Sequence, residues 1–156
     1  MRRIGLTAAG LLALLTLALA LVGNGRAKPG AAGAHTCSAP DRQFIQEART
    51  NMTALGLWAD EYGSGDAKAS EVVSEAKRAA KTVQGMGPTD PSLEQTQRLM
   101  VGMLTEYAKA VQLAEHHGDA GPHMYRAYGL ANFAHGVLEN AQPALSARGC
   151  DLSSLL

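Results

Sequence analysis

The sequence predicts an all-α protein: an up-down-up-down antiparallel four-helix bundle, preceded by a signal peptide and closed by one disulfide. Four stretches of the 156-residue chain repeat apolar side chains at spacings of three and four, which is the period of an amphipathic helix. Apolar residues make up 46% of the chain but aromatic residues only 4%, a balance that favours closely packed helices over a β-sandwich. The length allows a single domain.

The N-terminal segment, residues 1–34, is predicted to be a signal peptide followed by a disordered linker. Two arginines precede an uncharged apolar run at residues 4–22, and small residues follow, with cleavage expected after Ala27 or Ala34. The run is also long enough to cross a bilayer, so a single-span membrane anchor through residues 4–22 is the alternative. We expect contact with a membrane only if this segment stays uncleaved.

The domain itself, residues 35–156, is predicted to hold four helices, at about 41–62, 66–84, 91–117 and 122–142. Asp41 places a negative charge in the first turn of the first helix, and Asp66 is expected to cap the second. Asp90 followed by Pro91 is a strong start signal for the third helix. Pro143 is expected to end or kink the fourth near residue 142, because proline lacks the N–H that a helix interior needs.

The connections between these helices are short, which favours antiparallel neighbours. In such a bundle the start of the first helix and the end of the fourth lie at the same end of the molecule. Cys37 and Cys150 occupy those two positions, and they are the only cysteines. We therefore predict that they form one disulfide, which places the protein in an oxidising, extracytoplasmic compartment.

The turn between the third and fourth helices contains the strongest chemical pattern in the sequence. His117, Asp119 and His123 are candidate ligands for Zn²⁺ or Cu²⁺, because imidazole and carboxylate groups from two helix ends and their link could converge. The competing interpretation is a plain connection, in which histidine suits a helix C-terminus and Asp-Ala-Gly forms the turn.

A second set, Tyr128, His135 and Glu139, lies on one border of the fourth helix at spacings of seven and four. Glu139 could orient His135 as an acid or base, or His135 could ligate a haem with Tyr128 nearby. An ordinary hydrogen-bonded histidine at the edge of the core is the competing interpretation. A covalently attached c-type haem is excluded, because the chain has no CxxCH motif.

The remaining patterns argue against an enzyme and against nucleic acid as a partner. The chain has no GxSxG, P-loop, GxGxxG or ExxH motif, and removing the three arginines before residue 27 leaves 11 basic against 14 acidic residues, a net charge of −3. The sequence therefore predicts a secreted or envelope-associated, non-catalytic binding module for an unknown protein or small ligand, with no cofactor. The alternative is an extracytoplasmic metal- or haem-binding protein that uses the histidines of the turn.

Overall fold

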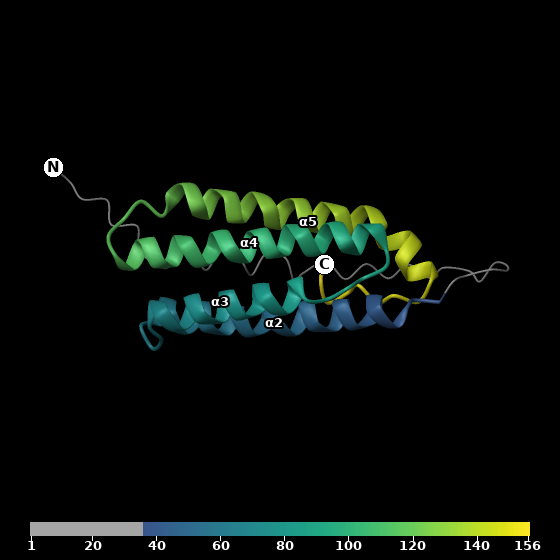
Figure 1. Ribbon diagram of the computed structural model, residues 1–156, viewed down its shortest axis with the longest axis horizontal. Coiled ribbons are helices and arrows are strands. Elements are labelled where there is room, and N and C mark those ends of the chain that lie inside the picture. Colours follow the sequence, from purple (N-terminus) through teal and green to yellow (C-terminus); the bar gives the residue numbers. More distant parts are fainter. Residues whose placement is uncertain (1–35) are drawn as a thin grey trace.

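The computed structural model describes residues 36–156, which form four α-helices and, within that range, no strand. The helices are α2 (Ala39–Ser64), α3 (Ala69–Gln84), α4 (Pro91–Glu115) and α5 (Gly121–Ala147), shown in Figure 1. The all-α class, the four helices and the Cys37–Cys150 disulfide are thereby confirmed. The predicted signal peptide, its cleavage sites, the linker and the alternative anchor at residues 4–22 lie outside the described residues.

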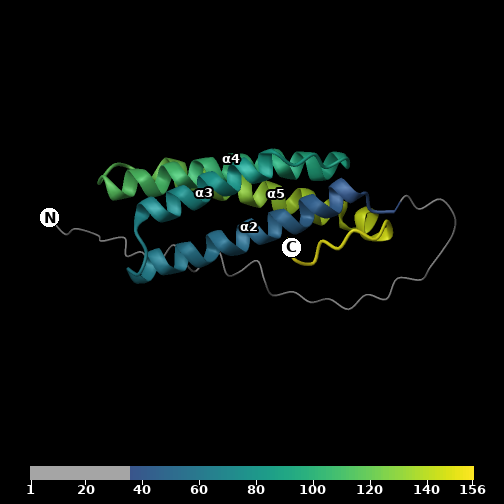
Figure 2. The same ribbon diagram turned by 60° about the horizontal axis from the view of Figure 1, so that its bottom comes forward.

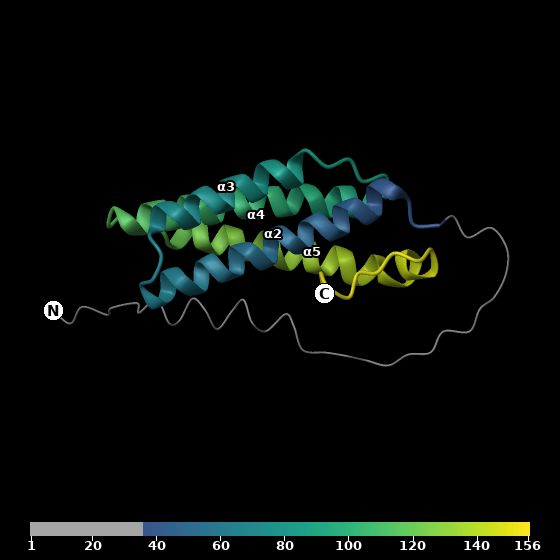
Figure 3. The same ribbon diagram turned by 90° about the horizontal axis from the view of Figure 1, so that it is seen from below.

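The helices pack as consecutive pairs: α2 against α3, α3 against α4, and α4 against α5. The colour gradient in Figure 1 shows that each helix runs opposite to the one before it along the long axis of the molecule. In the two turned views α2 is inclined to the α4–α5 pair (Figures 2 and 3). None of the described helices is both long and apolar enough to cross a membrane.

The core lies between these pairs and is built mainly from aliphatic side chains. Its largest fully buried members come from every helix and from the C-terminal tail: Phe44, Val72, Val83, Leu93, Leu104, Leu145 and Leu152. The predicted apolar faces of α2, α3 and α4 supply most of the core. Of the apolar residues that repeat at helical spacing along α5, only Ala127, Ala134, Leu138 and Leu145 are buried, so this helix contributes less to the core than its sequence suggests.

Several helix ends differ from the sequence prediction, among them the start of α3 and the end of α4. α3 begins at Ala69, not near residue 66, because Asp66 accepts a hydrogen bond from the Ser64 hydroxyl instead of capping the helix. The cap is Lys68, whose backbone N–H donates to Glu71 across 2.7 Å, as in one half of a capping box. α4 ends at Glu115, where the chain turns through His117 at a positive φ of 57°.

The prediction that Pro143 ends α5 near residue 142 is wrong, because the helix continues to Ala147 with the proline inside it. The alternative, a kink at this proline, stays a prediction. A proline removes one backbone hydrogen bond, which is a limited cost near the end of a long helix. The last turn is held in place by tertiary contacts: Leu145 is fully buried, and the chain three residues beyond the helix is tied down by the Cys150 disulfide. Packing here outweighs the local preference.

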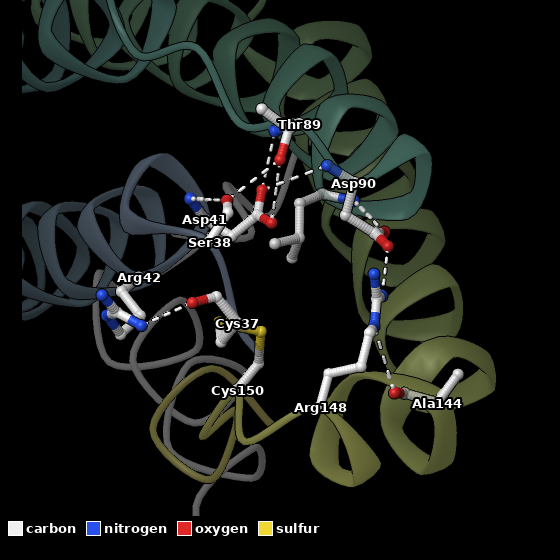
Figure 4. The surroundings of a disulfide bond; sticks show 10 residues. Cys37, Ser38, Asp41, Arg42, Thr89, Asp90, Ala144, Arg148 and Cys150 are labelled. Carbon is white, nitrogen blue, oxygen red and sulfur yellow. Dashed lines mark hydrogen bonds and ion pairs between the residues drawn. A yellow bond between two sulfur atoms is a disulfide. The ribbon is translucent and has the colours of Figure 1, made fainter. Parts of the chain in front are cut away.

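The disulfide closes one end of the molecule, where the start of α2, the start of α4 and the end of α5 meet (Figure 4). The Cα atoms of Cys37 and Cys150 are 5.1 Å apart, and the Cys37 N–H donates to the Arg148 carbonyl across 2.6 Å. The bond joins residues separated by 113 positions in the sequence. It therefore ties the two ends of the described domain directly to each other.

Two buried carboxylates extend this junction to α4. Asp41 of α2 accepts hydrogen bonds from the Thr89 N–H at 2.7 Å, the Thr89 hydroxyl at 3.0 Å and the Asp90 N–H at 3.1 Å. Asp90 caps α4 by accepting from the Ser92 N–H, and its second oxygen pairs with Arg148 beyond α5. Each carboxylate thus links two segments that are distant in sequence.

The protonation of these two carboxylates follows from their partners. Burial alone would raise both pKa values, but hydrogen bonds offset it: from the Ser38 side chain and the Thr89 and Asp90 backbone to Asp41, and from Arg148 to Asp90. The pKa of each carboxyl therefore lies below its usual value. Both stay ionised at neutral pH, and the junction is held by charged hydrogen bonds as well as by the disulfide.

Candidate functional site

The predicted metal ligands lie in the turn between α4 and α5, but the structure does not bring them together. His117 is exposed, and Asp119 accepts the Gly121 N–H across 3.1 Å, which is ordinary turn chemistry. His123 points to α4 instead. Among residues 36–156 no group of three or more His, Cys, Asp or Glu side chains is placed to hold a metal ion. A metal at this turn stays a prediction of the sequence.

His123 belongs to a polar cluster that joins α4 to α5. Its Nδ1 lies 2.8 Å from Glu106 Oε2, and Arg126 Nε donates to the same carboxylate oxygen at 2.8 Å. Lys109 Nζ donates to the other carboxylate oxygen, Glu106 Oε1, at 3.1 Å. The three partners together hold the pKa of Glu106 at about 2, with the His123 hydrogen bond as the largest cause and Lys109 next.

This cluster suits a structural role, in which it holds α4 against α5, better than a catalytic one. Glu106 contacts three partners, of which Lys109 and Arg126 donate to it, so it is a poor proton acceptor near neutral pH. Sequence reasoning missed the cluster because Glu106 and His123 are seventeen positions apart on different helices. The only available signal was that both lie near the ends that an antiparallel turn brings together.

The second predicted set is partly assembled on α5. His135 Nε2 lies 3.2 Å from Glu139 Oε1, so the expected pairing of these two side chains is present. The His135 side chain is 40% exposed and that of Glu139 is 61% exposed, and Tyr128, itself 47% exposed, lies on the same side of the helix. The arrangement is that of a surface ion pair, whose contribution to stability is usually below about 1 kcal/mol.

The most unusual surface of the described residues is the outward face of α5, defined here by Tyr125, Tyr128, Gly129, Phe133 and Gly136. Tyr125 is 79% exposed and Phe133 70% exposed, and with Tyr128 they make three of the four large exposed apolar side chains among the described residues. A Cβ built on Gly129 or Gly136 would meet nothing within 4 Å, so the surface between the aromatic rings is open.

This face also carries little charge. Only Arg126 and Glu139 are Lys, Arg, Asp or Glu in the 27 residues of α5, and Arg126 is already paired with Glu106. By contrast, the 16 residues of α3 include five: Glu71, Glu75, Lys77, Arg78 and Lys81. Tyr125 and Phe133 were not identified from the sequence, because they stand on the side of the helix opposite its apolar stripe, and Tyr128 was identified only as a partner of His135 and Glu139. The sequence signal that could have identified these aromatic residues is that their neighbours on this side of the helix are small or amide residues.

Known proteins offer no guide to this surface. Comparison of the chain with protein-family models, with curated proteins and with solved structures finds no match. The fold and the site together define an all-α, disulfide-closed domain that exposes an aromatic helix face.

Proposed function

We propose that this chain is a non-catalytic binding module that acts outside the cytoplasm, secreted or held at the cell envelope. In this proposal residues 1–34 are a signal peptide and linker, removed after Ala27 or Ala34, and the mature domain is an up-down-up-down antiparallel bundle. The disulfide supports this, because such bonds persist in oxidising compartments. The alternating directions of the four helices support the bundle topology.

The observation that carries the binding role is the outward face of α5. Water-exposed aromatic side chains gain free energy when a partner covers them, and tyrosine and phenylalanine are enriched at protein interfaces. A helix face that serves only as a solvated surface is normally charged, as α3 is. The face of α5 instead offers rings on either side of two glycines.

The chemistry of the face selects the kind of partner. Because it has almost no charge, electrostatic attraction to an acidic or basic ligand is not its basis. The two glycines lie seven residues apart, two turns along one stripe, and they allow another helix to approach closely. We therefore assign the partner as a protein that presents an apolar helix face, which would pack between Tyr125 and Phe133.

The native size of the protein in its own host tests this proposal. The parent chain, the Tyr125→Ser/Phe133→Ser variant and a Leu57→Ser control are each collected from the exported fraction and passed through size-exclusion chromatography with light scattering. Leu57 is a suitable control because it is an apolar residue on α2 that is 61% exposed.

We expect the parent and the Leu57→Ser control to elute in an assembly larger than the monomer, and the double variant to elute as the monomer. A parent chain that is already monomeric, or a double variant that keeps the larger size, would contradict the proposal. An assembly that contains only this chain would identify the partner as a second copy.

A further inference from the structure

We infer that a groove between α3 and α4 is a second binding site, and that its ligand is a small organic anion with an apolar body. The groove has a volume of about 420 Å³, within the range of about 300–1,000 Å³ that is typical of small-molecule sites. It lies on two helices that do not form the aromatic face of α5, so this inference does not rest on the proposed function.

The floor of the groove is apolar because small side chains face each other across the two helices. Ala80 of α3 and Val101 and Ala108 of α4 line it. Ala108 is buried, and the other two are half-buried. Larger side chains at these positions would fill the space, so the hollow follows directly from the sequence.

The rim of the groove is positively charged. Lys77 and Lys81 line it from α3 and Lys109 from α4, and no carboxylate is among the lining residues. The ammonium group of Lys109 is partly neutralised by Glu106 at 3.1 Å. Within residues 36–156 neither Lys77 nor Lys81 forms an ion pair.

The two α3 lysines are also placed unfavourably for a surface that binds nothing. They are four residues apart on one face of the helix, where like charges repel. The positions three and four residues before and after each lysine hold no Asp or Glu that could relieve this repulsion: Val73, Ser74, Arg78, Ala80, Gln84 and Gly85. An anion held between the two ammonium groups would remove the repulsion, while its apolar body would cover the floor.

The combination of floor and rim selects the ligand class. A bare inorganic anion would leave the apolar floor uncovered, and a neutral apolar molecule would leave the lysines without a partner. A carboxylate, sulfonate or phosphate on a short hydrocarbon or aromatic body satisfies both parts. Gln84 and Gln112 line the same groove and add hydrogen-bond donors for such a head group.

The test uses anilinonaphthalene sulfonate, a dye that combines a sulfonate with an aromatic body. Its fluorescence increases when it binds to an apolar site. The dye is titrated into the folded, disulfide-bonded domain and into three variants. Lys77→Gln/Lys81→Gln removes the proposed anion contacts. Arg49→Gln/Arg98→Gln removes the same amount of charge from exposed positions outside the groove. Tyr125→Ser/Phe133→Ser removes the aromatic face of α5, which is the other surface that could hold the dye.

We expect the lysine variant to bind the dye about tenfold more weakly or worse, since two charged contacts are lost, while the other two variants bind like the parent. Decanoate should displace the dye, and a short polyglutamate peptide should not. Equal weakening in the lysine and arginine variants, loss of binding only in the aromatic variant, or displacement by the peptide alone would each overturn the inference.

Discussion

Replacement of Asp41 by alanine should destabilise the domain more than any other single change of a charged side chain at the junction. Asp41 is 3% exposed and accepts three hydrogen bonds from the segment that starts α4. A hydrogen bond to a charged group contributes about 1.5–3 kcal/mol, and these three are not additive because they share one carboxylate. Thr89 is exposed, so water can replace part of what is lost. We expect a loss of about 3 kcal/mol in the free energy of unfolding.

The asparagine variant separates hydrogen bonding from charge. Asp41 Oδ1 accepts from both the Thr89 and the Asp90 N–H, and an amide oxygen can keep both bonds. The amide nitrogen then faces the Thr89 hydroxyl, which is able to accept. Asp41→Asn should therefore cost only about 1 kcal/mol.

Urea unfolding followed by circular dichroism, with the disulfide intact, measures both losses. Asp60→Ala, a change at an exposed carboxylate of α2, is the control and should stay within about 0.5 kcal/mol. Because the pKa of Asp41 is lowered in the folded state, its contribution is present above the unfolded-state pKa of about 4 and is lost as the pH falls further. The cost of Asp41→Ala should shrink accordingly in acid. A loss below about 1 kcal/mol at neutral pH, or equal losses for alanine and asparagine, would refute this account of the junction.

Three further changes probe the core, the crosslink and the α4–α5 cluster. Leu104→Ala, at a fully buried position, should lower the free energy of unfolding measured in urea by about 2–5 kcal/mol. His116→Ala, at an exposed position, should change it by no more than about 0.5 kcal/mol, and the reverse order would contradict the packing of α4. Reduction of the Cys37–Cys150 bond, which spans 113 positions, should cost about 4–5 kcal/mol in the chain-entropy model, and an unchanged thermal midpoint under reducing conditions would contradict it. Glu106→Gln should flatten the acid limb of the stability curve, because the pKa of Glu106 is about 2 in the folded state and its contribution is lost between about pH 4.5 and that value; parallel acid limbs for parent and variant would argue against the cluster.

The number, order and approximate bounds of the helices were predictable because each helix has its own local signals. Asp90 followed by Pro91 marks the start of α4 correctly, since a cap needs only neighbouring residues. The disulfide was also predictable, because only two cysteines are present and the helix count places them at one end. These features depend on information that lies close together in the sequence.

Other features depend on contacts between distant residues, and the sequence pattern did not contain them. α5 runs past Pro143 because Leu145 and the disulfide hold its last turn. His123 turns toward Glu106 on the neighbouring helix instead of toward His117 in its own turn. The helix period of α5 identified one apolar stripe, but it gave no sign that aromatic residues on the opposite side would stay uncovered.

Site-specific photo-crosslinking tests the central claim, which is that the outward face of α5 binds a protein, most directly. A photoreactive phenylalanine analogue at position 133 changes the native side chain little, and the same analogue at position 57 samples another exposed apolar site, on α2. Both chains are expressed in the native host. The cells are irradiated, and the exported protein is then isolated. We predict one discrete protein adduct from position 133 that disappears when Tyr125→Ser is added to the same chain, and none from position 57. The same adducts from both positions, or no adduct from position 133, would contradict the claim.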